Sequence, residues 1–333
     1  MQKKAKIYVA GHRGLVGSAI VRALNKEGYQ NLILRTHQDL DLTNEKVTLD
    51  FFKSEKPEYI FLAAAKVGGI LANQTYPADF IRENLLIQNN VIHAAYLNKV
   101  KRLLFLGSSC IYPKNAQQPI KEDCFLTGTL ESTNRAYALA KIAGVEMCWS
   151  YNRQFKTEFL AAMPTNLYGP NDNYDLNTSH VIPALIRKFH EAKIKNKPLV
   201  VVWGTGKPKR EFMYSDDMAK ACIFLMNLSK TQFKALLNPD LHNAMPPLIN
   251  IGVGYDLTIR ALANMIKKIT GFKGAIQFDI TKPDGTYRKL MDVSRLNQLG
   301  FKAETDLEKG LILSYESFMK EHQRYLKSYS QQS

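Results

Sequence analysis

The stretch Gly11-His-Arg-Gly14-Leu-Val-Gly17-Ser-Ala-Ile-Val-Arg-Ala-Leu24 directly follows the apolar run Ile7–Ala10 and opens an amphipathic helix. Glycines allow a backbone to turn tightly against a pyrophosphate, and the N–H groups at a helix start meet its negative charge. The spacing is GxxGxxG rather than GxGxxG, but the motif lies between a first strand and a first helix. We therefore expect the following loop residues to contact a dinucleotide: Gly11, His12, Arg13, Gly14, Leu15, Val16 and Gly17.

Apolar runs of strand length alternate with helix-period stretches through the first 165 residues. Their Val, Ile, Leu and Phe residues are nearly continuous, which is typical of strands covered by helices on both faces. The pattern predicts an α/β fold with a Rossmann-type, doubly wound parallel sheet. The predicted strands are Ile7–Ala10, Leu32–Leu34, Tyr59–Ala64, Arg102–Leu106 and Glu158–Met163.

The pattern loosens from Asn166 onward, with the turn-rich stretch Tyr168–Asn173, a helix-like stretch near Val181–Lys193 and an apolar strand at Leu199–Trp203. This change predicts a smaller C-terminal α/β domain for the substrate. We expect residues 1–165 to form the NADP-binding domain and 166–333 mainly the substrate domain, with segments near 212–255 returning to the first.

Composition excludes some classes of protein and leaves others open. The chain has 333 residues, 45% of them hydrophobic, and a formal net charge of +15. No apolar run reaches the roughly 18 residues that span a bilayer, so we expect a cytoplasmic protein without a membrane partner. The charge suits nucleic acid, the pyrophosphates of dinucleotides and nucleotide sugars, or a basic surface without a binding role. Neither a disulfide framework nor a metal site is indicated by the cysteines, Cys110, Cys124, Cys148 and Cys222.

The end of the second strand bears on the choice between NAD and NADP. An NAD site usually carries an acidic residue there, which accepts from the ribose 2′-hydroxyl, whereas this chain has Arg35-Thr36-His37. Arg13 and Arg35 could face a 2′-phosphate, which favours NADP(H). Asp41-Leu42 follow slightly later and could lie near the adenine.

Residues of a carbonyl-reducing site follow in the appropriate order. The fourth strand ends in Gly107-Ser108-Ser109-Cys110, and a later helical stretch carries Tyr137 and Lys141. The i, i+4 spacing places the last two on one helical face, where the ammonium could lower the pKa of the phenol from about 10. Tyr137 would then act as a general acid, and the Ser108 hydroxyl could bind the same substrate oxygen.

Together these motifs resemble the extended short-chain dehydrogenase/reductase family, whose members pair a Rossmann-type domain with a smaller domain for nucleotide sugars. The resemblance covers nearly the whole chain and is most specific to the members that epimerise and reduce GDP-4-keto-6-deoxy-D-mannose. It is carried by Gly11–Ser18, Ala63–Gly69, Gly107–Pro113, Met163–Pro170, Ser179–Pro183 and Lys282–Gly285.

The resemblance implies roles for individual residues. It assigns Ser108, Tyr137 and Lys141 to reduction and the pair Cys110 and His180 to epimerisation. It implies further NADP contacts at Leu106, Gly107, Pro164, Thr165, Asn166 and Leu167, together with Tyr137, Lys141, His180 and His37, and GDP-sugar contacts at Lys188, Trp203, Arg210 and Asp284. It also implies a homodimer built on helices around Tyr137 and Asn84–Ala95. One departure is His37, where an arginine is expected.

The implied mechanism follows from the acidity of C–H bonds beside a ketone. A 4-keto group acidifies C3 and C5, so a base can remove each proton and an acid on the opposite face can return one. We assign Cys110 as the base and His180 as the acid. C4 is reduced afterwards by NADPH, with the proton from Tyr137. The Cys110 thiol would need a lowered pKa, for which Lys141 is a candidate cation.

Two alternatives remain open at this point. One is another nucleotide-sugar epimerase or dehydratase with tightly bound NAD; it has no need of the Cys110 and His180 pair, or would carry an acidic residue near Cys110. The other is a redox-sensing or RNA-binding module suggested by the charge. No RNP-type or KH-type signature supports the latter, so we expect no nucleic-acid partner.

Overall fold

A six-stranded, fully parallel sheet with the order β10-β5-β4-β3-β1-β2 organises the chain. The computed structural model describes residues 1–237, 246, 248–282 and 284–330, so Pro283 and part of the predicted returning segment near 212–255 lie outside the described residues. The strands are β1 (Ile7–Ala10), β2 (Leu32–Ile33), β3 (Tyr59–Leu62), β4 (Arg102–Leu106), β5 (Phe159–Pro164) and β10 (Leu248–Ile251). The predicted doubly wound α/β class is confirmed.

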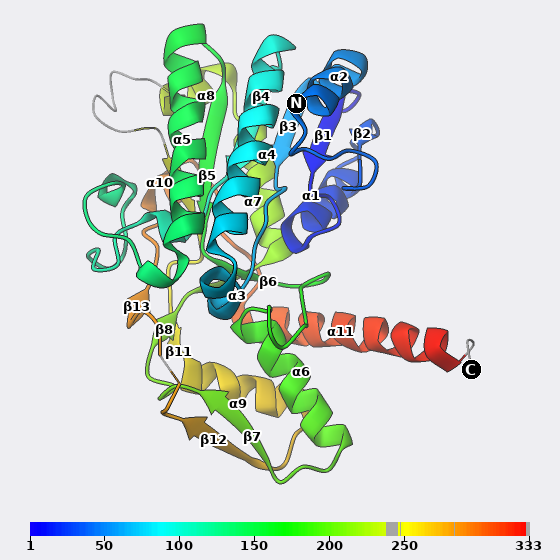
Figure 1. Cartoon of the computed structure of the whole chain (residues 1–333), viewed down its shortest axis with the longest axis vertical. Helices are drawn as coiled ribbons and strands as arrows, with labels where there is room; N and C mark the ends of the chain where they lie inside the picture. The colour runs from blue at the N-terminus through cyan, green and yellow to red at the C-terminus, as the bar shows by residue number, and fades with distance from the viewer. Residues whose placement is uncertain (238–245, 247, 283, 331–333) are drawn as a thin grey trace.

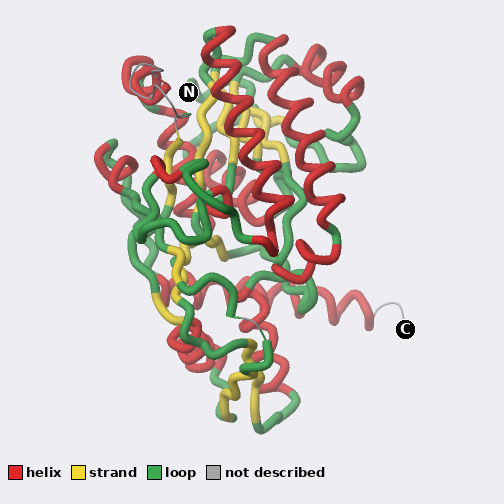
Figure 2. The backbone as a smooth tube through the Cα atoms, turned by 60° about the vertical axis from the view of Figure 1, so that its left-hand side comes forward, coloured by secondary structure: helices red, strands yellow, loops and turns green. Residues whose placement is uncertain are grey.

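Helices cover both faces of this sheet (Figures 1 and 2). The strands β1, β4 and β10 are buried at every position, which explains their continuous apolar sequences. One face packs against α2 (Glu45–Glu55), α4 (Pro77–Leu97) and α5 (Arg135–Phe155). The other packs against α1 (Leu15–Lys26), α7 (Ser215–Asn227) and α8 (Lys230–Leu237).

The strand order reverses between β1 and β3, and this point positions the site. Ligands of doubly wound sheets bind beyond the carboxyl ends of the strands at such a reversal. Gly11 leaves β1 there with φ +81°, and a Cβ on it would lie 2.7 Å from the Ala64 nitrogen beyond β3. Only glycine at position 11 allows these two segments of the chain to approach each other this closely.

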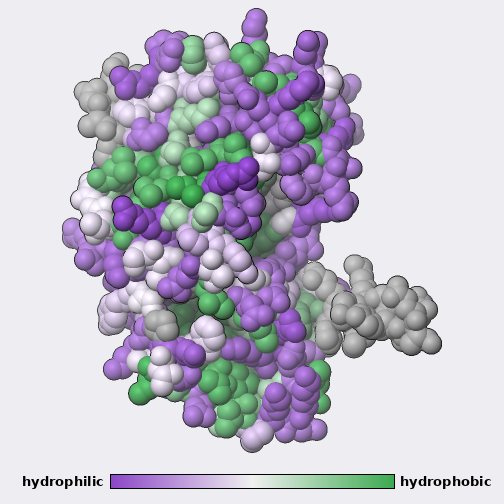
Figure 3. Space-filling model, in the orientation of Figure 1, coloured by the Kyte–Doolittle hydropathy of each residue, from purple (hydrophilic) through white to green (hydrophobic). Residues whose placement is uncertain are grey.

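A smaller lobe lies beyond the carboxyl ends of the sheet (Figure 1). Its core is formed by apolar side chains of α6, β7, β9, α9 and α11, together with Tyr168 of β6. Figure 3 shows a hollow between the two lobes on the face drawn. The remaining elements are α3 (Ile70–Thr75), β6 (Asn166–Tyr168), α6 (Val181–Ile194), β7 (Leu199–Trp203), β8 (Lys209–Arg210), β9 (Phe212–Tyr214), β11 (Leu257–Thr258), α9 (Ile259–Thr270), β12 (Ala275–Asp279), β13 (Arg288–Lys289), α10 (Ser294–Gln298) and α11 (Leu307–Ser330), with short 3-10 helices at Ser109–Ile111, Glu122–Cys124 and Ser132–Asn134.

Within the described ranges, no helix combines the length and the apolar character needed to cross a bilayer. The same residues contain no group of three or more His, Cys, Asp and Glu side chains placed to hold a metal ion.

Candidate active site

The glycine loop presents bare backbone toward the reversal in the sheet. Gly14 is the N-cap of α1 and supplies no side-chain cap, so the first N–H groups of the helix stay available to a ligand. A Cβ on Gly17 would lie 2.1 Å from the Gly11 carbonyl oxygen, which fixes the helix close to the loop. The loop therefore fits the pyrophosphate of a dinucleotide, as its spacing predicts.

The region after β2 differs from the expectation for Arg35. Its Nη2 lies 2.5 Å from the Glu55 carboxylate, and Nη1 donates to the Leu34 carbonyl at 3.0 Å. Arg35 therefore already has a carboxylate partner, and its contact with a 2′-phosphate stays a prediction. Arg13 and His37 are exposed beside it.

Asp41 closes the turn that follows. Its Oδ1 accepts from the Thr43 amide at 2.9 Å and from the Thr43 hydroxyl at 2.7 Å. His37 lies 3.8 Å from the same carboxylate, and its side chain is 81% exposed. Leu42 is buried and its carbonyl accepts from Asn90. Asp41 thus shapes the loop in which a cofactor's ribose end would lie.

The reductase residues meet at the end of β4. Lys141 extends from α5 and donates to the Leu106 carbonyl at 2.8 Å, and its Nζ lies 5.8 Å from the ring centre of Tyr137. Ser108 caps the first 3-10 helix by accepting from the Cys110 amide at 3.3 Å, and its hydroxyl is hydrogen-bonded to Tyr137. The i, i+4 face of α5 thereby delivers the phenol and the ammonium to the strand end.

Burial dominates the electrostatics of this cluster. Desolvation raises the pKa of Tyr137, the neighbouring Cys110 raises it further, and the hydrogen bond from Ser108 opposes both. Lys141 is not among the groups that shift the pKa of Tyr137 in this structure, and its ammonium donates to the Leu106 carbonyl. Desolvation also lowers the pKa of Lys141 to about 8. Tyr137 is therefore held as a protonated donor.

Cys110 lies in the same cluster and is 5% exposed. Burial raises the pKa of its thiol, while Lys289, the Ser108 hydroxyl and Lys141 act in the opposite direction. Lys289 is the strongest of these opposing influences, and sequence reasoning did not find it. It lies on the two-residue strand β13, paired in parallel with β8, and no spacing rule marks such a position.

His180 lies at the start of α6, in the smaller lobe. It is the N-cap of α6 and is exposed to solvent, while the surrounding protein lowers the pKa of its imidazole by desolvation. The segment before it is tied to the loop after β3, because the Gly69 amide donates to the Thr178 carbonyl at 2.9 Å. Because the pKa of the His180 imidazole is lowered, this side chain is mostly neutral at pH 7.

The residues expected to hold the GDP moiety fall into two neighbouring groups. Arg210 of β8 is the register partner of Lys289 and interacts electrostatically with Asp284. Asp284 also accepts from the Thr205 amide at 2.7 Å and hydroxyl at 2.8 Å, which fixes its loop to the end of β7.

The second group surrounds Trp203, which is 53% exposed. The ammonium groups of Lys188 and Lys282 each lie 5.5 Å from its ring centre. Desolvation lowers the pKa of Lys188. An exposed ring bounded by cations offers a flat stacking surface for a base next to charges that suit phosphates.

The segment Pro164–Leu167 lies where β5 ends. The Thr165 amide donates to Ile251 of β10 at 2.9 Å, and the Asn166 side chain donates to the Glu211 carbonyl at 2.8 Å. Glu211 is fully buried, and its carboxylate accepts from the amides of Val253, Gly254 and Met291. One buried carboxylate thus supports the loops on both sides of the hollow.

Comparison with known proteins agrees with this geometry. Residues 7–236 match the NAD dependent epimerase/dehydratase family. The chain is 54% identical to GDP-L-fucose synthase of Escherichia coli, covering 97% of this chain and 99% of that protein. It is 55% identical to putative GDP-L-fucose synthase 2 of Arabidopsis thaliana, covering 96% and 93%. A solved GDP-mannoheptose C4 reductase from Campylobacter jejuni, with NADP bound, is 43% identical, with a TM-score of 0.85 over 96% of this chain and 99% of that one.

Proposed function

The chain belongs to the NAD dependent epimerase/dehydratase family, and from this premise we propose that it converts GDP-4-keto-6-deoxy-D-mannose to GDP-L-fucose. The reaction is epimerisation at C3 and C5 followed by reduction of the C4 ketone, with NADPH as the reductant. The observation that supports both steps is the position of Cys110 in contact with the Ser108, Tyr137 and Lys141 cluster. The thiol and the reductase residues can therefore act on one sugar ring.

In the first step Cys110 removes the proton from C3 and from C5, while Ser108 and Tyr137 donate hydrogen bonds to the C4 oxygen as negative charge develops on it. His180 returns a proton on the opposite face, which inverts each centre. Lys289 assists by favouring the thiolate over the buried thiol. Arg210 and Lys188 bind the diphosphate, and Trp203 stacks on the base.

For the second step, a bound NADPH would supply the hydride that reduces C4. Tyr137 donates the proton to the C4 oxygen, and because its pKa is raised the phenol enters the reaction protonated. Lys141 orients the strand end through its bond to Leu106. The glycine loop and the Pro164–Leu167 segment would hold the dinucleotide.

A reductase without epimerase activity is the second candidate, because the C4 reductase named above shares this fold and 43% of its residues. Isotope exchange separates the two. The protein is incubated with GDP-4-keto-6-deoxy-D-mannose in D₂O while NADPH absorbance is followed, and deuterium in the product is then located by NMR. Oxidation of NADPH with label at C3 and C5 supports the proposal.

Cys110→Ser provides the matched variant and should lose labelling at both carbons. Cys148→Ser is the control, since Cys148 is a core residue of α5 outside the reductase cluster and the variant should keep the labelling. NADPH oxidation without label at C3 or C5 in the wild type contradicts the epimerase and favours the reductase alone.

The proposal includes a homodimer and a cytoplasmic location. Figure 3 shows apolar side chains gathered over the N-terminal part of α5 and the loop beside it, and exposed apolar residues there and on α4 include Leu139 and Leu97. The free cysteines, Cys110 among them, are consistent with the proposed location, because disulfides are rare in reducing compartments. Sedimentation and cell fractionation test these two parts of the proposal.

A further inference from the structure

A basic pocket lies at the opposite end of the sheet from the active site. Its volume is about 600 Å³ and its walls come from the end of α5, the start of β5 and α8. Tyr137 and Lys156 are separated by almost the whole of α5, so the pocket is about 28 Å from the reductase cluster at 1.5 Å per residue. The lining residues are Asn152, Lys156, Thr157, Glu158, Lys230, Thr231, Lys234, Ala235 and Leu237.

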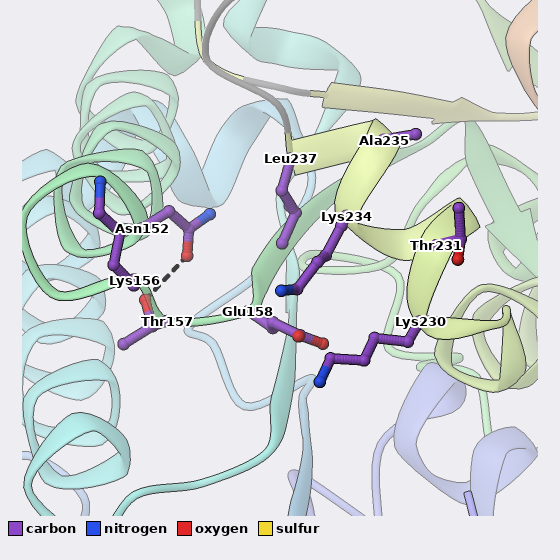
Figure 4. A pocket seen from close by; sticks show the side chains of 9 residues that line it. All are labelled: Asn152, Lys156, Thr157, Glu158, Lys230, Thr231, Lys234, Ala235 and Leu237. Carbon is purple, nitrogen blue, oxygen red and sulfur yellow. Dashed lines mark hydrogen bonds between the residues drawn. The ribbon is translucent and has the colours of Figure 1, made fainter.

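Cations outnumber anions on these walls. Lys156, Lys230 and Lys234 contribute three ammonium groups, and Glu158 contributes one carboxylate. Among the described residues, none of these lysines forms an ion pair. In Figure 4 the side chains of Lys230 and Lys234 extend from α8 toward Glu158 across the opening. Their i, i+4 spacing holds both on one face of the helix.

Glu158, the one carboxylate among the lining residues, already has a cationic partner. Glu158 pairs with Arg102 at 3.1 Å, and Arg102 is 9% exposed. The guanidinium is fixed by bonds to the carbonyls of Met226 and Leu228 at 3.0 and 2.7 Å and lies 4.0 Å from the ring centre of Phe233. The carboxylate of Glu158 is therefore paired with a buried guanidinium outside the pocket lining, and the three lysines of the lining have no ion-pair partner among the described residues.

The start of α8 adds to this field. The helix begins at Lys230, so the positive end of its dipole lies at the pocket. Thr231 adds a hydroxyl donor beside it. Phosphate groups are the ligands that such a combination of ammonium groups, a hydroxyl and a helix start binds best. The volume lies in the range of small-molecule sites.

We propose that this pocket, defined by Lys156, Lys230, Lys234 and Thr231, is a second anion site that binds a small diphosphate-bearing molecule. It is separate from the cleft that takes the dinucleotide and the GDP-sugar. The two lysines of α8 bind the phosphate oxygens, and the pairing of Glu158 with Arg102 reduces the repulsion between that carboxylate and the ligand.

Inorganic pyrophosphate is the probe, titrated by calorimetry into the full chain at about physiological ionic strength with NADP⁺ and GDP both saturating, so that the active site is filled. We expect one further binding event, weakened at least tenfold in Lys230→Gln/Lys234→Gln. Lys195→Gln/Lys197→Gln removes the same charge from exposed positions near the end of α6 and should leave the affinity unchanged.

Absence of the further binding event overturns the proposal, as does an equal loss of affinity in both double variants, which would indicate general attraction to a basic surface. Melting temperatures equal to that of the wild type verify that both variants are folded. The result does not depend on turnover, so the pocket stands or fails separately from the proposed reaction.

Discussion

Arg13 and Arg35 occupy different electrostatic settings, although both are arginines beside the expected 2′-phosphate. Arg35 is paired with Glu55 at 2.5 Å, whereas Arg13 is exposed in the glycine loop. A guanidinium that already has a carboxylate partner gains less from a phosphate. The preference for NADPH should therefore depend mainly on Arg13.

We expect Arg13→Ala to raise the Kd for NADPH about tenfold, with little effect on NADH, in line with the loss of one charge-assisted hydrogen bond. Arg35→Ala should have a smaller effect on the NADPH to NADH ratio. Fluorescence titration with NADPH and with NADH measures the Kd of each cofactor for both variants. A larger loss of discrimination in Arg35→Ala would show that its pair with Glu55 opens when the cofactor binds.

Lys141 makes stability depend on pH in a direction opposite to that of most paired lysines. Burial lowers its pKa to about 8 in the folded chain from the ordinary lysine value of 10.5. Between these values the unfolded chain binds more protons, so the free energy of unfolding rises as pH rises from about 8 to 10.5. The rise amounts to about 3 kcal/mol.

Lys141→Met should lack this rise, which urea unfolding of both proteins without ligands over that pH range measures. Lys26→Met, at an exposed position on α1, serves as the control and should follow the wild type. Parallel pH curves for wild type and Lys141→Met would mean that the ammonium is better solvated than its position indicates.

The short strands β8 and β13 are held in place by Glu211 rather than by their own length. Its carboxylate accepts from the amides of Val253, Gly254 and Met291 at 2.6, 2.8 and 2.9 Å. Glu211 lies beside Arg210, and Met291 follows Lys289 by two residues. A single side chain thus fixes the backbone that carries two cations to the hollow.

We expect Glu211→Gln to lower the free energy of unfolding by about 2–3 kcal/mol, because an amide NH₂ group then faces a buried N–H. Urea unfolding measures it. Glu304→Gln removes a carboxylate that is 74% exposed and should cost about 0.5 kcal/mol or less. If Glu211→Gln lowers the free energy of unfolding no more than Glu304→Gln does, then β8 and β13 do not depend on the Glu211 carboxylate.

At the scale of the whole molecule, the apolar surface over α5 and α4 is the proposed contact between two copies. Leu139 is 40% exposed on α5, and Leu97 is 51% exposed on α4. Glu at the position of Leu139 would place a charge in a desolvated contact, which costs several kcal/mol. The dimer should therefore dissociate.

Leu139→Glu should sediment as a monomer at micromolar concentration while the wild type sediments as a dimer. Ile312→Glu changes an equally exposed residue of α11 and should leave the dimer intact. If Ile312→Glu dissociates the dimer and Leu139→Glu does not, the contact between the two copies lies on α11 rather than on α5.

The sequence by itself determined the sheet, the glycine loop and the cluster at the end of β4, because each depends on local rules. Continuous apolar runs predict buried parallel strands, glycine spacing predicts the turn, and the i, i+4 rule places Tyr137 and Lys141 on one face. The predicted strand Arg102–Leu106 has the same bounds in the structure. The predicted end of the third strand, at Ala64, extends two residues beyond β3.

Only the tertiary structure decided which charges meet. Lys289 reaches Cys110 from a strand nearly 180 residues later in the chain, and Glu55 binds Arg35 across two elements. The direction in which the pKa of Tyr137 shifts also depends on how deeply the phenol is buried. It depends further on where the Lys141 ammonium lies, which its hydrogen bond to Leu106 fixes. Burial and long-range pairing arise from the three-dimensional packing of distant segments, and no local spacing in the sequence specifies them.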